Sequence, residues 1–154
     1  MSQSRVYFIP VDEHHSQEEI SVKLRRLLSE CNAFDFLRPK DRVALKIHFG
    51  EEGNTGYVKP CFARVICEEV SRKGAQAFLS DTNTLYRGRR LTSKEHLKLA
   101  EEHGFTSQGT GAEIIIPDDT IKENVAEVLL DGVFIKSAKI ARIFLDADAL
   151  IGIA

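Results

Sequence analysis

Short apolar runs alternate with amphipathic stretches along this chain, and that alternation constrains the fold more than any other feature. The runs are Arg5–Pro10, Val43–Phe49, Gln76–Leu79, Ala112–Ile116 and Ala149–Ile153. Continuous apolar runs are typical of strands that are buried on both faces of a parallel sheet. Strands of this kind separated by helices predict an α/β fold: a Rossmann-like, layered, mostly parallel sheet with helices on both faces.

Capping signals predict where the helices begin and end. The segments Ser16–Glu19 and Thr92–Glu95 both match the capping box, in which two side chains satisfy free backbone N–H groups. Pro60 suits the first turn of a further helix, where its missing N–H costs nothing. Gly74 and Gly104 follow the apolar stripes of two of these helices and predict their C-terminal ends.

One β-hairpin is expected within this pattern. Asp131-Gly132 lies between the apolar runs 125–130 and 133–137, which predicts a type I′ turn between antiparallel strands. Apolar residues at helical spacing over 140–147 predict one more helix before the last strand.

The charge balance narrows the functional classes. The chain of 154 residues, which we expect to form one α/β domain spanning 1–154, has 21 Lys and Arg against 23 Asp and Glu. A net charge of −2 argues against a basic surface for nucleic acid or for a membrane. No apolar run is long enough to span a bilayer. We therefore expect neither nucleic acid nor a membrane as a partner.

The cysteines, and the histidines of the helix expected before Gly104, show no metal-binding pattern. Cys31, Cys61 and Cys67 form no C-x-x-C pair, so we expect no disulfide framework, zinc site or iron–sulfur cluster held by this chain alone. Free thiols suit a reducing, cytoplasmic setting. We expect His96 and His103 at the surface or in capping positions.

Two polar loops follow expected strands, and open α/β sheets bind their ligands where such strands end. The loops span residues 46–57 and 80–90. Their candidate ligand-binding residues are Lys46, Gly50, Gly53, Asn54, Asn83, Tyr86, Arg87 and Arg89. Guanidinium groups pair well with phosphate and carboxylate, so we expect a small anionic ligand. The alternative is a pair of solvated loops whose glycines serve only the turns.

His48 and Asp81 are the candidate catalytic residues. Lys46 and His48 share one face of a strand, and a lysine in a strand that is otherwise buried indicates a polar pocket at the strand end. His48 would be a general base, or it would bind a divalent metal with Glu51 and Asp81. No compact metal-binding spacing supports the metal, and a packed histidine at a strand terminus is the alternative.

The two loops also resemble those of an uncharacterised family of proteins that are associated with ferredoxins or iron–sulfur centres. The resemblance rests on residues 43–51 with Gly53-Asn54, on 80–89, and on shorter matches at 102–105 and 146–151. It implies that the chain is the N-terminal α/β part of a longer protein whose 4Fe–4S clusters are bound after residue 154. It implies no catalytic residues.

Three functions remain open at this point. The preferred one is a redox-linked protein whose α/β part binds a small anionic ligand or a metal at the strand ends. The second is a metal-dependent isomerase or hydrolase of a small carboxylate or phosphate, which would turn over its substrate without electron transfer. The third is a docking module without chemistry. Because residues 149–154 are an uncharged strand, we also expect self-association through an open sheet edge.

Overall fold

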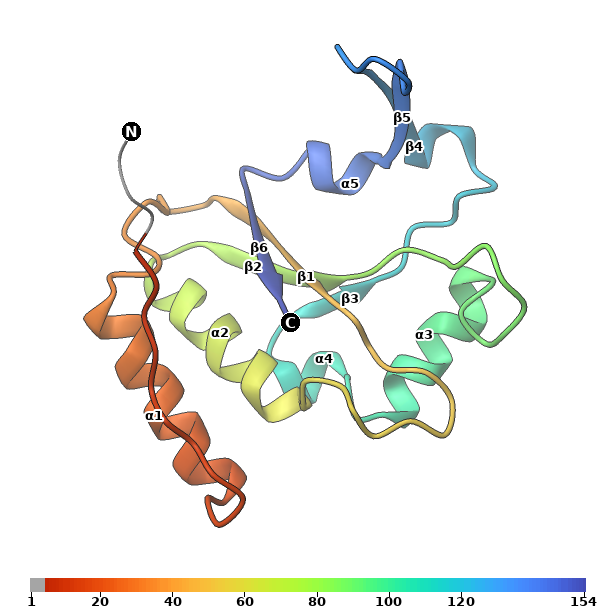
Figure 1. Ribbon diagram of the computed structural model, residues 1–154. Coiled ribbons are helices and arrows are strands. Elements are labelled where there is room, and N and C mark those ends of the chain that lie inside the picture. The colour runs from red at the N-terminus through yellow and green to blue at the C-terminus, as the bar shows by residue number, and fades with distance from the viewer. Residues whose placement is uncertain (1–4) are drawn as a thin grey trace.

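Four parallel strands form the main sheet of the protein. A computed structural model describes residues 5–154. The strands are β1 (Arg42–Ile47), β2 (Gln76–Ser80), β3 (Glu113–Ile115) and β6 (Ala149–Ile153), in the spatial order β3-β2-β1-β6 (Figure 1). The first and last residues of each strand lie within two residues of the ends of an apolar run that predicted a strand.

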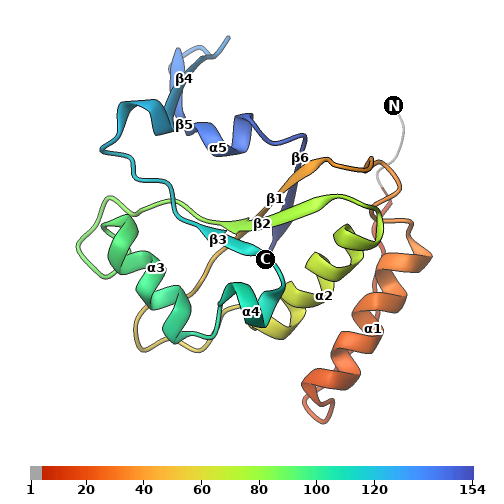
Figure 2. The same cartoon turned by 180° about the vertical axis from the view of Figure 1, so that it is seen from behind.

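Helices flank this sheet, mainly on one side. The helices are α1 (Gln17–Glu30), α2 (Pro60–Arg72), α3 (Ser93–Glu102), α4 (Ser107–Thr110) and α5 (Arg142–Leu145). Figures 1 and 2 show α1 to α4 on the same side of the sheet, whereas the short α5 lies on the other side. The predicted α/β class, with a mostly parallel sheet between helices, is therefore confirmed.

The hydrophobic core lies between the sheet and the two longest helices. Val43, Leu45 and Ile47 of β1 are fully buried, and so is Val70 of α2. Leu24 of α1 packs against the same core from outside α2. The alternation of strand side chains sends these three β1 residues to one face, so a single strand supplies much of the core.

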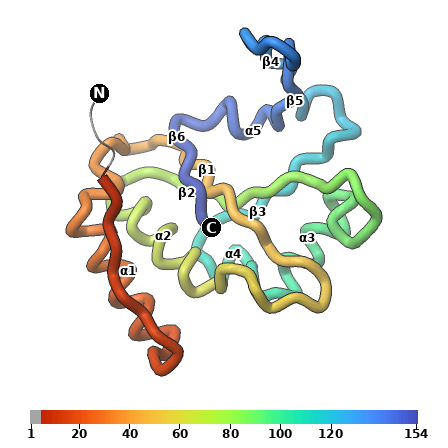
Figure 3. The backbone as a smooth tube through the Cα atoms, in the orientation of Figure 1, coloured from red at the N-terminus to blue at the C-terminus, as the bar shows by residue number. Residues whose placement is uncertain are grey.

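The connections place β1 at the point where the sheet reverses its order. The chain builds β2 and β3 on one side of β1 and then returns to place β6 on the other side (Figure 3). In an open parallel sheet, the crevice beyond the carboxyl ends of two such strands is where ligands bind. The pair β1 and β6 therefore marks the binding edge of this fold.

The predicted hairpin is present, but its turn differs from the prediction. The strands β4 (Val125–Leu129) and β5 (Ser137–Ala141) pair antiparallel in a second sheet, after the 3-10 helix η1 (Lys122–Asn124). Residues 130–136 connect them, and Gly132 does not have the positive φ that a type I′ turn needs. The apolar residues after Gly132 are exposed, so no packing holds them in a strand.

Two other predictions are wrong. Residues 5–10 form no strand; they run beside α1 as an extended segment, where Lys23 Nζ donates a hydrogen bond to the Pro10 carbonyl at 2.9 Å. The helix predicted over 140–147 is only the single turn of α5, because Ile140 and Ala141 pair with β4. In both cases the presence or absence of a strand to pair with, and not the local sequence pattern, decided the conformation.

The capping signals predicted the starts of α1 and α3 correctly. Ser16 and Glu19 form the complete capping box: the Ser16 Oγ accepts from the Glu19 N–H at 3.2 Å, and the Ser16 N–H donates to Glu19 Oε2 at 2.8 Å. At α3, the Thr92 Oγ1 accepts from the Glu95 N–H, and this is the half of the second box that the structure contains. None of the helices within residues 5–154 is long and apolar enough to cross a membrane.

Candidate functional site

The ends of β1 and β2 bring the first predicted site residues together. Lys46 pairs in register with Ser80, so the residue after Ser80 lies beside the lysine side chain. The Lys46 Nζ is 3.2 Å from Asp81 Oδ1. Asp81 is only 2% exposed, and a carboxylate at that depth needs a positive partner to remain charged.

Arg90 is the centre of the site. Its side chain is buried and donates from Nη2 to Asp81 Oδ2 at 2.9 Å, while Nη1 donates to Glu51. Its Nε donates to His96 Nε2 at 3.2 Å. One guanidinium group therefore joins the loop after β1, the end of β2 and the start of α3, as its rigid fork of donors allows.

Sequence reasoning considered the guanidinium groups of Arg87, Arg89 and Arg90 together but selected only the first two as ligand-binding residues. All three residues are arginines, so only their positions could distinguish the buried one. Arg90 lies closest to the helix that begins at Ser93. A side chain held beside a helix start is less free to reach solvent than those of Arg87 and Arg89 in the middle of the loop.

His48 lies where two hydrogen-bond donors meet. The Gly50 N–H donates to His48 Nδ1 at 2.8 Å, so a neutral ring carries its proton on Nε2. That Nε2 is 2.7 Å from Arg90 Nη1, which also carries protons. Two N–H groups thus approach each other closely, and an acceptor oxygen beside the pair, within hydrogen-bond distance of both nitrogens, would satisfy both. The side chain of His48 is half-exposed, so such an oxygen can enter from solvent.

His96 is buried, which corrects the expectation of a surface or capping residue. It is 0% exposed, and burial, followed by the charge of Arg90, lowers its pKa to about 4. Since Nε2 accepts from Arg90, the proton of the neutral ring lies on Nδ1, which has no hydrogen-bond partner among the described residues. The signal for its burial was its helical spacing to Leu99 and Ala100, which are also buried.

Tyr86 completes what we call the Arg90 cluster, whose members are Lys46, His48, Glu51, Asp81, Tyr86, Arg90 and His96. The Tyr86 hydroxyl donates to Glu51 Oε1 at 2.5 Å, and this bond to a carboxylate raises the pKa of Tyr86. Burial opposes ionisation of Glu51, but the hydrogen bonds from Tyr86 and Arg90 lower its pKa overall. Glu51 is therefore a carboxylate at neutral pH.

The other predicted ligand-binding residues lie outside this cluster. Arg89 makes a two-point ion pair with Glu102, at 2.5 and 2.8 Å, and Arg87 is exposed without an ion pair in the described chain. Asn83 Nδ2 donates to Ser93 Oγ and to Asp119, both at 2.9 Å, and so ties the loop to its neighbours.

Gly50, Gly53 and Asn54 shape the first loop. Gly50 has a φ of +96°, and a Cβ there would lie 2.6 Å from Tyr57 Cδ1 and 2.8 Å from His103 Nδ1. Gly53 has a φ of +74° in open space, and the Asn54 side chain accepts from the N–H two residues on. The first glycine is required by close packing, and the second only by its turn.

His103 is the C-cap residue of α3, which agrees with the expected surface or capping position, and it also anchors this loop. Its Nδ1 lies 2.8 Å from the Phe49 carbonyl oxygen, to which it donates, and Tyr57 stacks on its ring with centroids 4.6 Å apart. These contacts hold Gly50, and with it the amide that binds His48, in place.

The described residues present no cluster of metal-binding side chains. No group of three His, Cys, Asp or Glu side chains between residues 5 and 154 is placed to hold a metal. Cys31 and Cys61 are on different helices, and burial raises the pKa of the Cys67 thiol to about 12. Arg90 also bonds both Glu51 and Asp81, the carboxylates that we expected to bind a metal with His48.

Comparison with known proteins places the chain in a family. Residues 43–154, which include β1, the Arg90 cluster and β6, match the family model described as a domain of unknown function, DUF362. The chain belongs to the DUF362 family. No curated protein and no solved structure matches it. The matched segment begins within β1, and the residues before 43, including α1, lie outside it.

Replacing the two loop glycines separates packing from backbone strain. We expect Gly50→Ala to lower the free energy of unfolding by about 3 kcal/mol, because the new Cβ overlaps Tyr57 and His103 at a positive φ. Gly53→Ala is the matched control and should cost about 1 kcal/mol, from its φ alone. Urea denaturation measures both values, and equal losses would contradict the packing role of Gly50.

Stability should depend on pH through His96. Its folded pKa of about 4 lies below that of an unfolded histidine, so the unfolded state binds a proton first as the pH falls. The free energy of unfolding should therefore fall by about 2–3 kcal/mol between pH 6.5 and 4. His96→Gln should flatten that fall, whereas the exposed control His14→Gln should keep it. Parallel curves for all three proteins would refute the assignment.

Proposed function

We propose that this protein binds a small anionic ligand at the Arg90 cluster. The observation that carries the proposal is the close approach of His48 Nε2 and Arg90 Nη1, two N–H donors 2.7 Å apart. Glu51 Oε1 accepts from Nη1 but lies 3.8 Å from Nε2, too far to satisfy the histidine. A carboxylate or phosphate oxygen beside the two nitrogens would accept from both groups. Lys46 lies on the same rim, half-exposed, and adds a positive charge.

The carboxylates of the cluster support this role by fixing the cations. Asp81 contacts Lys46 and Arg90 from its buried position, so it orients both without itself facing solvent. The ligand would therefore meet donors that are already placed, which lowers the entropy lost on binding. In this proposal Asp81 is a positioning residue, and Arg87 in the neighbouring loop adds a further charge for attraction.

His48 is the group that would exchange a proton with the ligand. Its ring is held by the Gly50 N–H, and the proton on Nε2 points to the place where the ligand oxygen would bind. A histidine with one nitrogen fixed and the other directed at a bound oxyanion is suited to general acid–base work. This is the catalytic part of the proposal, and it depends on the binding part.

Binding is tested with two simple anions. We expect inorganic phosphate or succinate to bind in isothermal titration, and Lys46→Ala and His48→Ala each to weaken that binding by tenfold or more. Lys136→Ala, in the hairpin connection, removes the same charge at a remote place and should leave the affinity unchanged. Binding of neither anion, or an equal loss in all three variants, would contradict the proposal.

We further propose that the protein is redox-linked, through iron–sulfur clusters that are bound outside residues 1–154. This part rests on the family resemblance of the two loops, and the residues described here supply no ligands for a cluster. Protein produced from the native gene without oxygen should contain iron and acid-labile sulfide in equal amounts, and its reduced form should give an electron paramagnetic resonance signal. Iron-free protein, purified with its native partners, would refute the redox link.

A further inference from the structure

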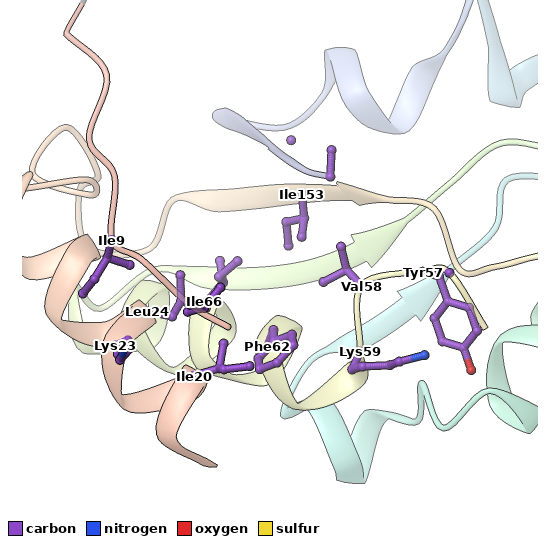
Figure 4. A pocket seen from close by; sticks show the side chains of 14 residues that line it. Ile9, Ile20, Lys23, Leu24, Tyr57, Val58, Lys59, Phe62, Ile66 and Ile153 are labelled. Carbon is purple, nitrogen blue, oxygen red and sulfur yellow. The ribbon is translucent and has the colours of Figure 1, made fainter. Parts of the chain in front are cut away.

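A second binding surface lies at the carboxyl end of β6, apart from the Arg90 cluster. It is a groove of about 700 Å³ between the extended segment before α1, helix α1, the start of α2 and the last residues of β6 (Figure 4). Apolar side chains form its walls: Ile20, Leu24, Val58, Phe62, Ile66 and Ile153. None of the residues that line it belongs to the Arg90 cluster.

The position of this groove in the fold favours a ligand. It lies beside the end of β6, the strand placed on the far side of β1 after the sheet has reversed its order. The first loop separates it from the Arg90 cluster: Glu51 faces the cluster, whereas Tyr57 and Lys59 line the groove. A volume of this size is in the range of sites for small organic ligands.

Two lysines with no ion pair line the same groove. Lys59 Nζ donates to the Thr55 carbonyl oxygen at 2.5 Å and lies 4.1 Å from the centre of the Tyr57 ring. Lys23 makes its hydrogen bond to a carbonyl oxygen of the extended segment. Within residues 5–154, neither amine has a carboxylate within ion-pairing distance. Backbone hydrogen bonds and, to a smaller extent, the charge of Lys23 lower the pKa of Asp12 and of Glu19, so the groove combines its apolar floor chiefly with the positive charge of Lys59.

We propose that this groove binds a free single-chain amphiphile with an anionic head, namely a medium-length acyl carboxylate. Its hydrocarbon chain lies along Ile20, Phe62 and Ile66, where each methylene leaves water. Its carboxylate lies at Lys59, which keeps its apolar stem along the groove and its amine at the rim. An apolar chain with one anionic end matches both halves of this surface, whereas a compact polar anion matches only the lysines.

The test separates the contribution of the anionic head group to binding from that of the hydrocarbon chain. Dodecanoate, kept below its micelle concentration, should bind the protein saturably in fluorescence or calorimetric titrations, and dodecanol should bind at least tenfold more weakly. Lys59→Gln should lower the affinity for dodecanoate about tenfold and leave that for dodecanol unchanged. Ile20→Trp should abolish binding of both by filling the groove. The control Lys122→Gln removes an exposed lysine of η1 and should change neither affinity.

Several results would overturn it. Equal affinities for dodecanoate and dodecanol would remove the role of the lysines, and dodecanoate binding that survives Ile20→Trp would place the ligand elsewhere. Binding to anionic phospholipid vesicles that Ile20→Trp abolishes, without binding of free dodecanoate, would make the surface a membrane contact. Dimerisation that Ile20→Trp abolishes would make it an interface between copies. The phosphate and succinate titrations test the Arg90 cluster and not the groove, so the failure of one proposal would not contradict the other.

Discussion

The ion pair between Arg90 and Asp81 is the interaction on which the arrangement of the binding edge depends. Both side chains are buried, so removing either would leave the other charge with one partner fewer away from water, which is costlier than losing a surface ion pair. The remaining donors of Arg90 hold Glu51 and His96, so with Asp81 the guanidinium joins three separate segments of the chain. A neutral His96 is part of this balance, because a second cation beside the guanidinium would repel it.

Most of the main sheet could be predicted from the sequence, because its signals are local and agree with one another. The runs that became β1 and β2 are apolar throughout, and the Ser16 capping box marks the start of α1. The failures came where pairing partners decided the outcome. Residues 5–10 have strand composition but no strand beside them, and Ile140 has helical neighbours but pairs with β4.

The candidate site was less accessible to sequence reasoning. The loops were recognised as binding segments, and the structure does bring Lys46 and Asp81 together with His48 nearby. The side chain at their centre was not found, because the burial of one arginine among three depends on how a loop folds against a helix. His96 was missed for a related reason: its residue type does not indicate burial, and only its helical spacing to Leu99 and Ala100 places it on the buried face of α3.

The return of the chain to β1 also has a consequence for how the protein forms. Arg42, at the start of β1, donates its N–H to Asp148 Oδ2 across a separation of 106 residues, and β6 pairs along the length of β1 directly after that contact. The strand that contributes most to the core therefore keeps one edge unpaired until nearly all of these residues have been synthesised. Contacts of such long range slow folding, and an open apolar edge invites association during the delay. For a nascent chain of this protein, the interval between β1 and β6 is the period in which a chaperone would have most to protect.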